Sequence, residues 1–130
     1  MSENQNLDPA ALERLHKLGG DAFVGKMIGL FLDYAGGKVA AARQAQAEGN
    51  LAAMQEAVHP IKSSAGNVGA RRVQELAQQI EQLARQGQGD KLAALTGELE
   101  AAFAAVKVEL TQKKSSLTVS SSGTDASRSV

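Results

Sequence analysis

The residues best suited to chemistry lie in the stretch HPIK, residues 59–62, where one of only two histidines stands three residues before a lysine. A neutral imidazole offers one nitrogen as a nucleophile while the other donates a hydrogen bond that fixes the tautomer. The ammonium group of Lys62 could neutralise a phosphoryl group on that nitrogen. Spacing alone also fits an ordinary surface helix, because mixed polar faces are usual there.

The same helix places His59 on a polar stripe. Its apolar positions include Val58 and Ile61, so His59 lies about 100° round from the core and should be reachable. Glycine in a helix interior costs stability, and close approach by another chain is one reason to accept that cost. We therefore treat the stripe as a candidate docking surface; its members are Gln55, His59, Lys62, Ser63 and Gly66.

Pro60 directly follows the candidate nucleophile. Proline inside a helix costs about 3 kcal/mol and here leaves the carbonyl of Glu56 without its helical donor. The apolar spacing continues from Val58 to Ile61, which favours one helix kinked at the site. The proline would then tilt His59 outward or stiffen its turn. If a helix began at the proline instead, His59 would be its cap.

The elements that must position these residues are predicted to be helices. Alanine, leucine, glutamine and glutamate are abundant and aromatic residues make up 3% of the chain, a composition that favours helices over strands. Asp8, Asp21, Asn50 and Asp90 are candidate caps. The predicted helices cover residues 8–18, 21–49, 50–68, the segment between Gly69 and Gly87, and 90–112.

The predicted fold is all-α: an antiparallel up-down four-helix bundle with a short additional N-terminal helix. Short connections and one apolar stripe per helix favour this arrangement. In the second segment the apolar residues at helical spacing are Phe23, Met27, Leu30 and Tyr34, and Gly36-Gly37 could bend the helix. We expect the domain to span residues 1–112. Residues 113–130, rich in serine, are predicted to be a flexible tail.

Composition excludes several function classes. Basic and acidic residues balance at 14 each, so no global field favours nucleic acid or an anionic membrane. The absence of cysteine excludes disulfides and thiolate sites. No run approaches the roughly 18 apolar residues of a membrane span, and no signal pattern begins the chain, so we expect a cytoplasmic protein. His16 is assigned to the surface, and no metal or cofactor is expected.

The run HPIKSSAGNVGARRVQELAQQIEQLARQG, residues 59–87, resembles the histidine-containing phosphotransfer (HPt) domain family. The family motif is a histidine, two residues, a lysine, small residues, and a glycine opening the next helix. The resemblance extends more loosely over residues 8–112. It implies a multistep phosphorelay in which His59 accepts a phosphoryl group from one receiver-domain aspartate and passes it to another. It implies no ATP binding, with Mg²⁺ supplied by the receiver. Pro60 departs from the family pattern.

The resemblance also implies roles by position. Lys62 corresponds to the cation that stabilises the phosphoryl group, and Glu81 to the side chain near the other histidine nitrogen. Ser63 stands where glycine is common, leaving room for docking, and Gly66 matches a small position that faces the partner. Arg85 could add positive charge near the site, or form only an i, i+4 pair with Glu81.

The expected partners are receiver domains, docking on apolar residues around His59, and we expect a monomer. Leu15, Leu18 and Phe23 are candidates for this surface and equally for the core. One alternative function is a helical adaptor of the same fold whose histidine is never phosphorylated. Another is a structural bundle that self-associates and has no affinity for receivers.

Overall fold

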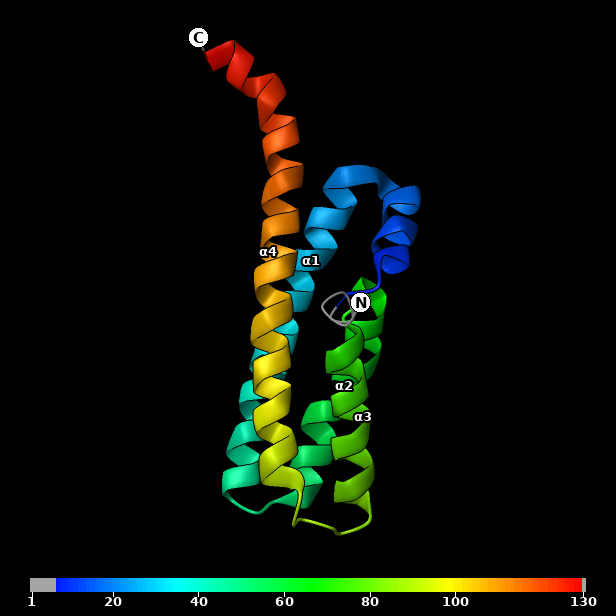
Figure 1. The fold of residues 1–130 in the computed structure, drawn as a ribbon, viewed down its shortest axis with the longest axis vertical. Coiled ribbons are helices and arrows are strands. Elements are labelled where there is room, and N and C mark those ends of the chain that lie inside the picture. Colours follow the sequence, from blue (N-terminus) through cyan, green and yellow to red (C-terminus); the bar gives the residue numbers. More distant parts are fainter. Residues whose placement is uncertain (1–6, 130) are drawn as a thin grey trace.

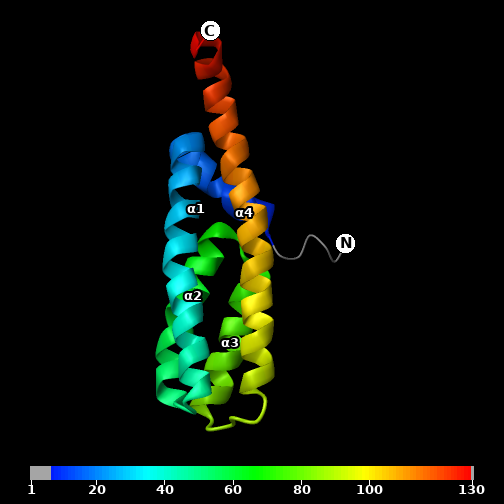
Figure 2. The ribbon, with the colours of Figure 1, turned by 90° about the vertical axis from the view of Figure 1, so that its left-hand side faces the viewer.

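The computed structural model describes residues 7–129, with side chains as far as Leu117, and shows four helices packed as a bundle (Figure 1). The connections are short and successive helices run in opposite directions. Around the bundle, α1 packs beside α2 and α4, and α3 packs beside the same two helices (Figure 2). The prediction of an all-α four-helix bundle is confirmed. The helices are α1 (Pro9–Ala47), α2 (Leu51–Val68), α3 (Arg71–Arg85) and α4 (Leu92–Ser129).

Local signals explain where α1 and α2 begin and where α2 ends. The side chain of Asp8 accepts a hydrogen bond from the Ala10 N–H at 3.1 Å, and that of Asn50 accepts from the Ala53 N–H at 3.0 Å. Each cap thereby pairs a donor that the first helical turn leaves free. Gly69 ends α2 in the left-handed region, with φ 79°, where glycine carries no side-chain penalty.

The separate N-terminal helix predicted at residues 8–18 is not a fifth element of the bundle. Residues 9–19 are the first part of α1, which continues across one non-helical residue, Gly20 (φ 76°, ψ −168°). Figure 1 shows the chain doubling back in this region (blue). Asp21 consequently lies inside α1 instead of capping a new helix, and α1 passes through Gly36-Gly37 in helical conformation.

The start of the chain is fastened to the turn between α2 and α3. The Asp8 N–H donates to the Gly69 carbonyl at 2.7 Å, and Leu7 pairs with Ala70. A side chain at Gly69 would clash with this segment, because an added Cβ would lie 2.5 Å from the Asp8 carbonyl oxygen. The first part of α1 therefore packs on the end of the α2–α3 hairpin.

The last helix is longer than the sequence predicts. We expected it to end near residue 112, but α4 continues to Ser129 and its final part projects beyond the other helices (Figure 1). Serine and threonine favour helices less than alanine or leucine do, which explains the earlier predicted end. The flexibility predicted for residues 113–130 stays a prediction, and residue 130 lies outside the described residues.

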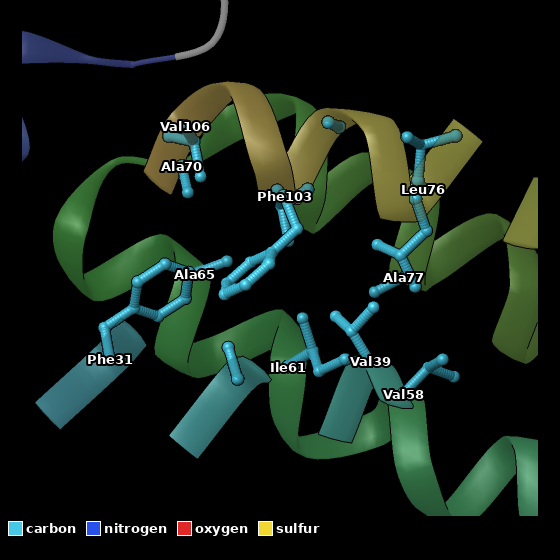
Figure 3. Close-up of a cluster of buried hydrophobic side chains, with 14 of the residues drawn as sticks. Phe31, Val39, Val58, Ile61, Ala65, Ala70, Leu76, Ala77, Phe103 and Val106 are labelled. Atoms are coloured by element: carbon cyan, nitrogen blue, oxygen red, sulfur yellow. The ribbon is translucent and has the colours of Figure 1, made fainter. Parts of the chain in front are cut away.

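The core is built from one apolar stripe per helix (Figure 3). In α2 the predicted stripe is the buried one. In α1 the buried residues lie one position from those predicted, and Leu30 and Tyr34 are about half exposed. Apolar residues occupy both positions of each turn, so spacing could not tell which would be buried. The buried stripe of this part of α1 is Val24, Ile28, Phe31 and Ala35.

Candidate functional site

One buried carboxylate joins the charged side chains of the candidate site. Glu81 on α3 is 6% exposed, and its Oε2 lies 2.6 Å from Nδ1 of His59 on α2. The same oxygen lies 3.3 Å from Nη2 of Arg85, while Oε1 contacts the Lys62 ammonium group. The structure thus brings His59, Lys62 and Arg85 together around Glu81, and the Arg85 contact is the i, i+4 pair given above as one of its two possible roles.

Helix geometry explains why the side chains of α2 and α3 come together at Glu81. His59 and Lys62 are three residues apart on one face of α2. On α3, Glu81 follows Ile80 on the face that packs into the bundle, and both are buried. Because α2 and α3 are joined by a tight turn at Gly69, they lie side by side and Glu81 reaches α2.

The neighbours of Glu81 determine its ionisation and the tautomer of His59. Burial by itself would raise the pKa of Glu81, but hydrogen bonds and charges from Lys62 and His59 lower it below its ordinary value of 4.5. At neutral pH Glu81 is therefore a carboxylate and can only accept hydrogen bonds. Nδ1 of His59 must donate, which leaves the lone pair of the neutral ring on Nε2. The His59 side chain is 68% exposed, so an external group can reach it.

Pro60 lies inside α2, which confirms the prediction of one helix through the site. Side chains donate to the carbonyls of Pro60, Ile61 and Lys62. Ser64 Oγ lies 3.0 Å from the Pro60 carbonyl oxygen and 3.3 Å from that of Ile61. From α3, Gln74 Nε2 donates to the Lys62 carbonyl at 3.1 Å. Sequence reasoning missed both donors: the i−4 spacing could have indicated Ser64, but Gln74 acts across helices.

The other residues of the polar stripe differ in exposure. Ser63 is exposed, and Gln55 and Gly66 are partly buried. A Cβ added at Gly66 would lie 2.8 Å from Gln74 Nε2. A contact between α2 and α3 therefore accounts for the glycine, whereas its predicted role at a partner surface stays a prediction.

The three predicted docking residues lie in different environments. Leu15 is buried in the core, which decides between its two predicted roles. Leu18 is 77% exposed next to the bend in α1, and Phe23 is partly buried. Sequence reasoning missed Leu30 and Tyr34 as surface residues because they belong to the stripe it assigned to the core.

An apolar hollow lies beside the helix that carries His59. It measures about 160 Å³ and lies open to solvent between α1 and α2. Its lining on α2 includes Ser64. Exposed apolar area in a hollow of this kind is typical of an interaction surface. The lining residues are Met27, Leu30, Phe31, Tyr34, Ser64, Asn67 and Val68.

Two further features lie away from this cluster. A larger hollow, about 940 Å³, lies between the first part of α1 and α4, lined among others by Leu12, His16, Asp21 and Lys113. Among the side chains of residues 7–117, no group of three or more acidic or histidine residues could hold a metal ion. Within residues 7–129, no helix has the length and apolar character to cross a membrane.

Comparison with known proteins shows the family of this chain. The family model of the Hpt domain matches residues 26–109, which include the whole of α2 and α3. The chain belongs to the Hpt domain family. As an Hpt domain, it is a phosphotransfer protein of a phosphorelay.

A solved structure shares the fold of this Hpt domain. The crystal structure of histidine-containing phosphotransfer protein B from Pseudomonas aeruginosa PAO1 matches with a TM-score of 0.80 at 22% sequence identity. The match covers 85% of this chain and 95% of that one. A comparison with curated proteins gave no match.

Proposed function

We propose that this Hpt domain carries a phosphoryl group between receiver-domain aspartates on Nε2 of His59. The observation that supports this most directly is the 2.6 Å contact between His59 Nδ1 and the buried Glu81 carboxylate. That contact holds the proton on Nδ1 and leaves Nε2 as the nucleophile. Lys62 supplies the nearby positive charge.

The proposed step is a phosphoryl transfer from an aspartyl phosphate. The Nε2 lone pair attacks phosphorus, the N–P bond forms, and the P–O bond to the aspartate breaks as its carboxylate leaves. Because Nδ1 keeps its proton, the ring becomes an imidazolium whose positive charge faces Glu81. The Lys62 ammonium neutralises charge on the phosphoryl oxygens. Reversal of these events on a second receiver completes the relay, and Mg²⁺ comes from the receiver.

The proposed partners dock on the apolar surface between α1 and α2. Leu30 and Tyr34 are 53% and 48% exposed, and both line the hollow between α1 and α2. A receiver helix seated there would bury these side chains and bring its aspartate to His59. Leu18, Phe23 and Ser63 are proposed to extend the contact area. One receiver at a time would bind to a monomer.

A phosphotransfer assay tests this function. Phosphorylated receivers from the same genome are mixed with the protein, with His59→Gln as the test variant and His16→Gln as its matched control. We expect acid-labile, alkali-stable label on the wild type and on His16→Gln, and none on His59→Gln. If the wild type stays unlabelled while it is folded and binds receivers, the adaptor function replaces the relay.

A further inference from the structure

Two side chains of α3 reach across to α2 at the candidate site. Gln74 and Glu81 are seven residues apart, about 10 Å along one face of the helix. Gln74 Nε2 donates to the Lys62 carbonyl at 3.1 Å, while Glu81 contacts the Lys62 ammonium group and His59 Nδ1. Lys62 is therefore held from α3 at its backbone and at the end of its side chain.

Gly66 leaves the space that the Gln74 amide occupies. A Cβ built at Gly66 would lie 2.8 Å from Gln74 Nε2 and 3.5 Å from its Cδ. Gly66 follows Lys62 by four residues, so its missing side chain opens a gap directly above the Lys62 carbonyl. A methyl group there would displace the amide, which is the far end of a flexible side chain, and would break the hydrogen bond.

The remaining contacts between α2 and α3 are largely apolar. The buried face of α3 also carries Val73, Leu76, Ala77 and Ile80. Apolar packing is not directional, so it tolerates small shifts of one helix along another more readily than a hydrogen bond with fixed geometry does. A directional bond two turns from Glu81 can therefore decide where Glu81 meets α2.

We propose that Gln74 is a positioning residue of the phosphotransfer site. The Gln74 amide occupies the gap at Gly66 and donates to the Lys62 carbonyl, and this bond sets the register of α3 against α2. The register in turn determines whether the Glu81 carboxylate contacts His59 and Lys62. The expected effect on the transfer rate rests on the proposed function, but the register of the two helices can be tested without any phosphotransfer.

The kinetic test uses Gln74→Ala, Gly66→Ala and the double variant, with Gln78→Ala as a matched control at an exposed position of α3. Each single variant is expected to lower the transfer rate at saturating receiver about tenfold, because small misplacement of reacting groups is costly. Gln74→Ala, which lies outside the predicted docking stripe, should leave receiver affinity unchanged. The double variant should be no slower than either single one, since both remove the same hydrogen bond. Gln78→Ala should match the wild type.

The second readout is the ¹⁵N spectrum of the His59 ring, recorded after circular dichroism has shown that each variant is folded. Gln74→Ala and Gly66→Ala should lose the pure Nδ1–H tautomer expected of the wild type. An unchanged His59 spectrum, a loss confined to receiver affinity, or fully additive effects would each overturn the proposal. If the wild type is never phosphorylated but both variants change the spectrum, the positioning role stands and the proposed relay fails.

Discussion

Two histidine–carboxylate pairs in this molecule have similar geometry but different surroundings. His59 Nδ1 lies 2.6 Å from Glu81, and His16 Nε2 lies 3.0 Å from Asp21. The Glu81 side chain is 6% exposed, whereas that of Asp21 is 46% exposed. The contact alone therefore does not make a site; the burial of the carboxylate distinguishes the two pairs.

The surroundings decide what each carboxylate can do. Glu81 is also paired with the cations Lys62 and Arg85, in a setting where water screens their charges less. An exposed pair such as His16–Asp21 is screened by solvent and contributes about 0–1 kcal/mol to stability. The two pairs differ in two ways: Glu81 is buried and lies on another helix than His59, whereas Asp21 is exposed and lies on the same helix as His16.

The largest effect in this comparison is expected from Lys62→Ala. Removing one charge that stabilises a developing anion typically lowers a rate about 100-fold, so transfer at saturating receiver should fall by about that factor. Lys17→Ala, which removes the lysine next to His16, is the matched control and should change the rate less than about twofold. Equal effects of the two variants would contradict the role of Lys62.

A smaller effect is expected from Glu81→Gln, which keeps the size of the side chain but removes its charge. The amide no longer forces the proton onto Nδ1, and it loses the ion pairs with Lys62 and Arg85, so transfer should slow about tenfold. Asp21→Asn makes the corresponding change at the other histidine. In single-turnover transfer, Glu81→Gln should be slower than the wild type and Asp21→Asn should not. A wild-type rate for Glu81→Gln would show that the charge of Glu81 is dispensable.

Glu81→Gln should also change how the stability of the fold depends on pH. The pKa of Glu81 is lowered in the folded protein, so its contribution is fully present above pH 4.5 and is lost as pH falls through the lower folded pKa. At pH 7 the wild type should exceed Glu81→Gln by about 1–3 kcal/mol in free energy of unfolding. Denaturant titrations between pH 7 and pH 3 should show this gap closing; a constant gap would rule out the charge as its source.

The smallest effect is expected from Asp21→Ala. Its pair with His16 is exposed, so the free energy of unfolding should change by less than about 0.5 kcal/mol. Thermal unfolding at low and at high salt checks this value. A loss above about 2 kcal/mol would mean that this pair is as important to the fold as the buried one.

Much of the fold follows from local features of the chain. The caps Asp8 and Asn50 and the buried seam of α2 were predicted from spacing and side-chain type. The buried stripe of α1 was not, because apolar residues line two adjacent faces and only packing selects one. For the same reason, the sequence could not decide whether Leu15 is buried, since an apolar residue on a short helix can belong to the core or to an exposed docking surface.

In the candidate site, too, local sequence features predict some of the arrangement and only the tertiary structure shows the rest. By itself the sequence determined that His59 and Lys62 share one accessible face of α2, because helical periodicity relates residues of one helix. Glu81 was found through family resemblance and not through spacing, since it lies 22 residues from His59. Only the tertiary structure decided that Gln74 meets the Lys62 carbonyl above Gly66. How one helix lies on another depends on packing summed over the whole core, and no local repeat in the chain encodes it.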